Sequence, residues 1–488
     1  MKIMAVVRLG ASCALVAFGG ALAASAEEKI PITTASQDAR QLYVKGRDLS
    51  EKLRATDARA LFQQAVAKDP DFALAQVGLA NTAGTPKEFF DAVNRAVALT
   101  GKASEGERQI ICSLDAGAKG EPGRQSDCLT KLTQAFPTDE RAHTLMGAYR
   151  FGQQDWAASV EAFKKATELN PSFSQPYNQM GYAYRFMGKY PEAEQAFKKY
   201  IALIPDDPNP YDSYAELLMK MGRFEESIKT YEKALSVDPN FVASYIGIGN
   251  NRMFMGQPEE ARKAFARMTA IARNDGEKRQ ALFWTAMSYV HEGAHDKAIG
   301  ELQKMAAIDQ SDKDLAALSG VINRMGDVLL DAGRADEAAA KYREQVTTIE
   351  KADVPAQVKE ATRRQAIFDA ARVALAKNDL QTAKGRASAY ADAVAVKNLP
   401  FEVRQSHELA GQIALAEKSY PTAVAELRQA NDQDPRVLYL TALALQGAGD
   451  PQKAKEVGAQ AADFNALSPT YGFVRGKAKA MIKEPKRN

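Results

Sequence analysis

The segment from Tyr177 to Pro205 reads YNQMGYAYRFMGKYPEAEQAFKKYIALIP, and its pattern returns along the chain. Apolar residues at positions i, i+3, i+4 and i+7 lie on one face of a helix. This is the spacing of Tyr177, Met180, Gly181 and Tyr184. A glycine and a second apolar stripe follow, so we expect two helices joined by a tight turn.

The same features return every 34 residues, which indicates an internal repeat. One column holds a small residue, at Gly147, Gly181, Ala215 and Gly249. A second column is aromatic, at Phe163, Phe197, Tyr231 and Phe265. Turn glycines occur at Gly188, Gly222 and Gly256, and prolines close the units at Pro137, Pro171, Pro205 and Pro239. Because neither helix of a unit can bury its apolar stripe alone, neighbouring units must stack.

These residues resemble the tetratricopeptide repeat family, with Tyr200 in place of the usual small residue. That family has an aromatic residue, a leucine, a glycine and a tyrosine on the first helix, then alanine, an aromatic residue, alanine and proline on the second. The resemblance implies an all-α fold, a superhelical solenoid of about 11–12 helix-turn-helix units. In such a superhelix the first helices line a concave groove and about eight units complete one turn. The resemblance further implies a protein-binding scaffold.

The repeat register predicts the organisation of the whole chain. Units are expected to begin near Ala39, Ala73, Gly106, Glu140, Ser174, Pro208, Val242, Arg279, Ser319, Arg364, Arg404 and Pro435. We divide the chain into a signal peptide (1–26), N-terminal repeats (27–138), closely matching repeats (139–312), divergent repeats (313–469) and a C-terminal capping helix and tail (470–488).

The first residues have the features of a secretory signal peptide. Lys2 and Arg8 give a positive start, a short apolar run follows, and Ala24-Ser25-Ala26 has the small-x-small cleavage pattern. We expect cleavage near Ala26 and export to the periplasm. An uncleaved anchor is the alternative, but the run is shorter than the ~20 residues that span a bilayer, and no later segment is apolar enough to cross one.

The charge of the chain limits the class of its partner, and the cysteine content bears on its cellular compartment. The net charge is +3, and removal of residues 1–26 takes away two positive charges to leave +1, which argues against a nucleic-acid partner. Only Cys112 and Cys128 remain after cleavage, and an oxidising compartment favours a disulfide between them. Two buried thiols are the alternative.

The sequence HEGAH, His291 to His295, fits the H-E-x-x-H pattern of zinc proteases. Two zinc-binding histidines must lie one turn apart on a continuous helix. Gly293 instead falls in the turn column of the repeat, so His291 should end one helix and His295 should follow the corner as a packing residue. We therefore expect no enzyme, no metal and no cofactor.

Function is then expected to reside in the concave groove. First-helix residues that pack against neither partner helix should point into it. They are Asn178, Gln179, Tyr182, Arg185, Asn209, Asp212, Ser213, Glu216, Asn250 and Met253, with Phe283, Trp284 and Met287 adding apolar surface. Asparagine can pair with a peptide backbone, and tyrosine and tryptophan supply rigid contact area. The alternative for each polar residue is a solvated helix face. A clamp for a terminal carboxylate is not expected, since Ile246 stands where that clamp needs a lysine.

The favoured hypothesis is a non-catalytic scaffold of the cell envelope that binds a protein or peptide in its groove. A structural assembly subunit of an envelope secretion or polysaccharide machine is the second hypothesis. A metalloprotease that uses His291, Glu292 and His295 is the third. The sequence leaves the oligomeric state open.

Overall fold

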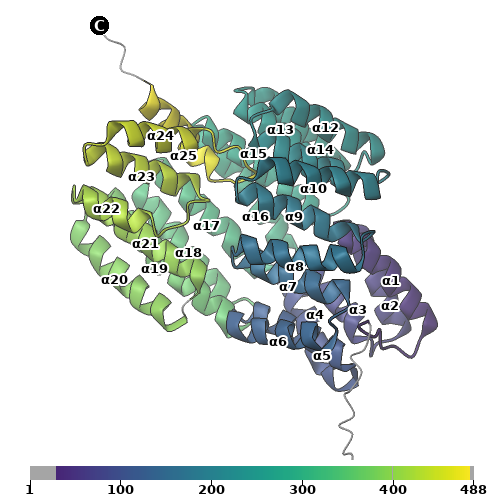
Figure 1. Ribbon diagram of the computed structural model, residues 1–488. Helices are drawn as coiled ribbons and strands as arrows, with labels where there is room; N and C mark the ends of the chain where they lie inside the picture. Colours follow the sequence, from purple (N-terminus) through teal and green to yellow (C-terminus); the bar gives the residue numbers. More distant parts are fainter. Residues whose placement is uncertain (1–28, 398, 484–488) are drawn as a thin grey trace, which may run out of the picture.

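The computed structural model describes residues 29–397 and 399–483, and across them only helices form regular structure (Figure 1). The predicted signal peptide lies outside these residues. The helices pair into twelve units, numbered 1 to 12 along the chain, and α25 (Tyr471–Ile482) follows the last unit. A short 3-10 helix, η1, spans Thr100–Lys102.

Each unit consists of a first helix and a second helix. The first helices are α1 (Gln37–Glu51), α3 (Ala73–Asn81), α5 (Glu105–Ala118), α7 (Glu140–Gly152), α9 (Ser174–Phe186), α11 (Asn209–Lys220), α13 (Val242–Phe254), α15 (Asp275–His291), α17 (Leu315–Asp331), α19 (Ala356–Ala376), α21 (Pro400–Ala416) and α23 (Pro435–Gly447). The second helices are α2 (Ala55–Lys68), α4 (Pro86–Ala98), α6 (Pro122–Ala135), α8 (Trp156–Leu169), α10 (Tyr190–Leu203), α12 (Phe224–Val237), α14 (Pro258–Ile271), α16 (His295–Ser311), α18 (Ala335–Glu350), α20 (Leu380–Lys397), α22 (Tyr420–Leu427) and α24 (Pro451–Ala462).

The predicted all-α solenoid is confirmed, and four late units begin earlier than the repeat register placed them. The first helices of units 8, 9, 10 and 11 start before the expected Arg279, Ser319, Arg364 and Arg404. Local start residues explain the difference. Asn274 accepts a hydrogen bond from the backbone of Glu277 and so caps α15, and prolines stand at or just before the starts of α19 and α21. The divisions between signal peptide, repeats and cap stay a prediction.

The small and aromatic columns fit into one another within units 4, 5 and 7. Phe197 is fully buried, and a Cβ atom added at Gly181 would lie 2.6 Å from its ring. The same contact joins Gly147 to Phe163 at 2.5 Å and Gly249 to Phe265 at 2.2 Å. A side chain at these glycines would push the two helices apart, so the column must stay small.

The proline and turn columns close each unit. The carbonyl groups of Pro171, Pro205 and Pro239 each accept a hydrogen bond from the hydroxyl of the tyrosine six residues later. At the turn between the helices, Gly188 and Gly222 have φ angles of +71° and +76°, a left-handed conformation that suits glycine.

The stacked units form a superhelix in which later units contact earlier ones. Arg54, at the start of α2, pairs with Asp238 at 3.3 Å, and Asp57 pairs with Arg273 at 3.3 Å. Contacts also join α4 of unit 2 to α17 of unit 9. Arg404 of unit 11 hydrogen-bonds to Gln154 of unit 4. Units that lie five to seven apart in the chain therefore meet, and successive turns of the superhelix contact each other (Figure 1).

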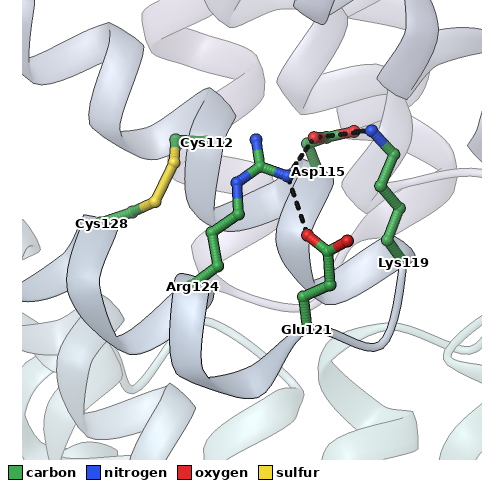
Figure 2. The surroundings of a disulfide bond; sticks show 6 residues. All are labelled: Cys112, Asp115, Lys119, Glu121, Arg124 and Cys128. Carbon is green, nitrogen blue, oxygen red and sulfur yellow. Dashed lines mark hydrogen bonds and ion pairs between the residues drawn. A yellow bond between two sulfur atoms is a disulfide. The ribbon is translucent and has the colours of Figure 1, made fainter. Parts of the chain in front are cut away.

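A disulfide links the two helices of unit 3 (Figure 2). Cys112 of α5 and Cys128 of α6 have Cα atoms 6.0 Å apart, within the usual range for a disulfide. Beside it, Arg124 pairs with Asp115 at 3.0 Å and with Glu121 at 2.9 Å, also between the ends of these helices. Within the described part of the chain, no helix combines the length and the apolar character needed to cross a membrane.

Two glycine substitutions test the helix contact. We expect Gly181→Ala to lower the free energy of unfolding by about 1–3 kcal/mol, because the new methyl group would overlap the Phe197 ring. Gly300→Ala is the control, since Gly300 lies inside α16 with no atom within 4 Å of the added Cβ. It should stabilise the protein by about 0.5–1 kcal/mol through helix propensity. Urea unfolding measures both, and equal effects of the two variants would contradict the contact.

Mass spectrometry of protein alkylated without reduction tests the disulfide, and should find Cys112 and Cys128 unmodified. The Cys112→Ser, Cys128→Ser double variant should lose about 3 kcal/mol of stability, the loop-closure contribution of a loop of this size. Two alkylated thiols in the purified wild-type protein would rule the linkage out.

Candidate functional site

The predicted groove residues of units 5 and 6 form a hydrogen-bonded network. The hydroxyl group of Tyr182 donates to Glu216 Oε2 at 2.8 Å, and the buried Arg185 guanidinium pairs with the other oxygen of the same carboxylate. Arg185 also lies over the ring of Tyr182, 4.8 Å from its centroid. Ser213 is 3.4 Å from the same hydroxyl. These side chains therefore tie α9 to α11, and Gln179 beside them is half-buried.

Further predicted residues are buried polar groups that bond within the array. Asn209 donates to the hydroxyl of Tyr200 at 2.8 Å, and Asp212 accepts from Ser244 at 2.7 Å. Burial raises the pKa of Asp212 from 3.8 to about 7, and the charge of Glu216 raises it as well. Asn178 is also buried, and its side-chain oxygen has no hydrogen-bond partner among the described residues.

Asn250 does not face an open groove, which differs from the expectation drawn from its position. It is fully buried and donates to the carbonyl group of Ile246, one turn earlier on its own helix. The apolar residues of this set are also inside. Met253, Trp284 and Met287 belong to one core cluster that runs through units 6 to 9 and includes Tyr471 of α25, with Phe283 packed at its edge. Binding of a partner by the predicted residues stays a prediction.

An open groove lies instead in units 1 to 4. A cavity of about 500 Å³ is bordered by the first helices of these units. Its apolar lining includes Tyr43, Phe62, Leu74, Val77, Ile110 and Leu145. A second cavity of about 320 Å³ adjoins it and shares Val77, Asn81, Ile110, Leu145 and Ala148. We call these two connected cavities the N-terminal groove.

Charged residues surround the apolar floor of the N-terminal groove. Arg141 pairs with Glu51 at 2.9 Å and with Glu140 at 2.9 Å, and lies over the ring of Phe173. Arg47 reaches Glu51 only at 3.7 Å, so its guanidinium group is less tightly held than that of Arg141. The N-terminal groove thus combines an apolar floor with the guanidinium group of Arg47, which can donate hydrogen bonds to a bound partner.

The chain's own first described residues run along one wall of this groove. The backbone N–H of Ile30 donates to Asp139 Oδ2 at 2.8 Å, and that of Thr33 donates to Glu107 Oε1 at 2.7 Å. Lys29 pairs with Glu140, and Thr34 hydrogen-bonds to Asp69. These acidic residues stand at or near the starts of α3, α5 and α7, so residues 29–34 cross three successive units.

Sequence reasoning missed both the groove and this segment. The spacing of Ser104 and Glu107 predicts only a helix cap, and Glu107 does cap its own helix, because its Oε2 accepts from the backbone of Ser104. Its Oε1 meanwhile holds Thr33. A capping carboxylate has a second oxygen, and nothing in the spacing tells whether that oxygen binds water or another segment.

The HEGAH segment bends as the repeat register predicts. His291 is the last residue of α15, Gly293 has a φ of +73°, and His295 opens α16. His295 Nε2 is 3.0 Å from Asp331. Burial, with the nearby charges of Arg475 and Lys479, lowers the pKa of His291 to about 4. The two imidazoles therefore belong to different helices and contact different neighbours. Among the described residues, no group of three or more His, Cys, Asp or Glu side chains is arranged to hold a metal ion.

The stacked helix pairs and the groove along their first helices define an α-helical repeat protein of the superhelical class. Sequence models of the tetratricopeptide repeat match residues 43–104, 162–195 and 218–283. The chain is thus built from tetratricopeptide repeats. No curated protein matches it.

Several solved structures are similar to the chain at low identity. A tetratricopeptide repeat protein from Parabacteroides merdae is 14% identical, with a TM-score of 0.37, over 54% of this chain and 99% of that one. A thermophilic tetratricopeptide repeat protein from Thermus thermophilus is 18% identical, with a TM-score of 0.33, over 39% and 99%. The APC/C hetero-tetramer Cut9–Hcn1 is 13% identical, with a TM-score of 0.40, over 85% and 76%.

The buried carboxyl of Asp212 gives a pH-dependent prediction. The folded protein keeps this proton up to about pH 7, whereas the unfolded chain releases it near 3.8, the ordinary pKa of an aspartate. The contribution of the Asp212 carboxyl to the free energy of unfolding is therefore fully present at low pH and is lost as the pH rises towards 7. Asp212→Asn cannot ionise, so its melting temperature should exceed that of the wild type at about pH 8 and match it at about pH 4.

Asp296→Asn is the control, because the Asp296 side chain is 91% exposed. The difference in melting temperature between wild type and this control should not depend on pH in that way. A pH-independent difference for Asp212→Asn would show that the carboxyl is not held neutral in the folded protein.

Proposed function

We propose that the protein is a non-catalytic scaffold of the cell envelope, and that the N-terminal groove binds a segment of a protein partner. The observation that carries the proposal is the course of residues 29–34. Backbone N–H groups of this segment are held by Asp139 and Glu107 across the first helices of successive units. The wall of the groove is therefore already shaped to hold an irregular peptide by its main chain.

The remaining space suggests the chemistry of the partner segment. An apolar side chain fits the floor formed by Leu74, Val77 and Leu145. A carboxylate or carbonyl oxygen can accept from Arg47. Asn81 is exposed where the two cavities meet, and its amide can both donate to and accept from a peptide backbone. An extended segment with an apolar residue next to an acidic residue meets all three requirements.

The envelope location rests on the leader-like residues 1–26 and on the pair of cysteines. An N-terminal charge, a short apolar run and a small-x-small site are the features of an exported chain. Structural disulfides persist in oxidising compartments. The thiol measurement described above therefore also bears on this part of the proposal.

Filling the groove tests the function. Ala148 is exposed and borders both cavities, so Ala148→Trp should occupy the groove without disturbing the core. We expect this variant to lose at least about tenfold in affinity for the partner, since a filled pocket excludes the apolar anchor. The matched control is Ala157→Trp, at an exposed alanine of α8 outside both cavities.

Affinity capture from cell envelopes under mild crosslinking gives the readout. A protein captured by the wild type and by Ala157→Trp, but not by Ala148→Trp, would support the groove as the binding site. Capture of the same proteins by both variants, with equal melting temperatures, would contradict it.

A further inference from the structure

The C-terminal helix lies against two distant parts of the superhelix. α25 follows unit 12 and contacts α23 and α24, as expected, but it also contacts α15 of unit 8 (Figure 1). The ring of Tyr471 meets that of Phe254 edge-on at 5.0 Å and that of His291 at 5.7 Å. Just before α25, the ring of Phe464 lies under Lys220 Nζ at 4.1 Å. Residues 464–482, which we call the C-terminal segment, therefore cover the ends of the first helices of units 6 to 8.

The approach of α25 to α15 is close. A Cβ atom added at Gly472 would lie 3.3 Å from the carbonyl oxygen of Met287 and 3.6 Å from the side chain of Val290. Lys477 pairs with Asp331 at 2.6 Å, at the end of α17. Val290 is 3% exposed beneath this cover.

Buried polar atoms without a hydrogen-bond partner gather at this contact. Among the described residues they include the hydroxyl of Tyr471, Nε and Nη1 of Arg475 and Nδ1 of His291. Arg475 is 3% exposed, donates to Asn465 at 3.0 Å, and lies over the ring of Phe254 at 4.5 Å. A buried donor without an acceptor loses its water and gains no bond in return, so these atoms weaken the docking of α25.

Lys477 has an ion-pair partner at this contact in Asp331, whereas the buried Arg475 has none among the described residues. From Arg475 to Lys483, the chain carries four basic residues and no acidic one. The titratable side chain of α15 that lies against Tyr471 is His291, and burial lowers its pKa to about 4, so its imidazole is uncharged near pH 7. A buried guanidinium next to an imidazole gains nothing from ion pairing.

We infer that the C-terminal segment is a displaceable internal ligand of the inner surface of units 7 and 8, and that an acidic helix with an aromatic side chain takes its place. The aromatic side chain of such a helix would occupy the position of Tyr471 against Phe254. A glutamate at the position of Arg475 would face His291 and supply the acceptor that the internal contact lacks. This inference is independent of the N-terminal groove and can hold or fail separately from it.

Thiol labelling of the full chain tests the displacement. A Val290→Cys variant places a thiol beneath α25, where it reacts only when α25 leaves. Val160→Cys is the reference, at a position in α8 that is also 3% exposed and lies away from the C-terminal segment. Peptide mass spectrometry under non-reducing conditions measures the labelling rate of each introduced thiol. We expect the thiol of Val290→Cys to label at least about tenfold faster than that of Val160→Cys, because local opening costs less than global unfolding.

Three further substitutions, each combined with the labelling variants, then identify what weakens the docking of α25. Arg475→Met removes the unpartnered donors and should slow labelling in the Val290→Cys chain by about tenfold, the effect of one unsatisfied group. Lys479→Met, one helical turn further along and exposed, removes a charge but no buried unpartnered donor, so it should change the rate by less than about twofold. Tyr471→Ala should accelerate labelling in the Val290→Cys chain and leave that in the Val160→Cys chain as it was. Equal rates for the two introduced thiols, or faster labelling with Arg475→Met, would overturn the inference.

Fluorescent peptides test the external ligand. A peptide with the sequence of residues 467–483 and Arg475→Glu should bind the Tyr471→Ala chain at least about fivefold more tightly than the peptide of native sequence, through the added charge-assisted bond. Equal or weaker binding of the glutamate peptide would overturn the assignment of an acidic ligand.

Discussion

The contact between a glycine on the first helix and a buried aromatic ring on the second holds units 4, 5 and 7 together. Gly147, Gly181 and Gly249 leave room for rings that are completely buried. Burial of a ring of this size contributes about 2 kcal/mol or more, and the contact is repeated from unit to unit. Because it fixes the distance between the paired helices, it gives these units a common shape, and the small rotation between stacked units produces the curvature of the superhelix.

The curvature of the superhelix brings distant units into contact. The inner surface differs between units 1 to 4 and units 6 to 8. Units about seven apart contact one another through pairs such as Arg404 with Gln154. In units 1 to 4 the first helices leave a groove open, and residues 29–34 cross its wall. In units 6 to 8 the corresponding surface is covered by the C-terminal segment. The same repeated architecture therefore presents one open and one occupied surface, and the C-terminal segment makes the difference.

The repeat columns were sufficient to predict the fold. A strict spacing of small, aromatic and proline residues reports contacts inside one unit, which are local in sequence. The late helices began earlier than predicted because caps such as Asn274, and not the columns, determine where a helix starts. Several turns of divergent units also hold a non-glycine residue at positive φ, for example Asn378 and Lys418, so the turn column vanishes from the sequence there although the turn remains.

The candidate site was less predictable, for a physical reason. The helical face of Asn250 and Trp284 follows from periodicity, but their exposure depends on what covers that face. Tyr471, which belongs to the same core cluster as Trp284, lies more than 180 residues later in the chain. The roles of Asp139 and Glu107 likewise depend on a segment more than 70 residues away. Long-range contacts of this kind leave no trace in a local pattern.

Site-specific photo-crosslinking in living cells tests the central claim, that the open groove of units 1 to 4 is the working surface. A photoreactive residue placed at Asn81, where the two cavities meet, should form a covalent adduct with one protein partner. The same residue at Ala157 on α8 should form none. Adducts at position 157 but not at position 81 would contradict the account and move the binding surface to the outer helices.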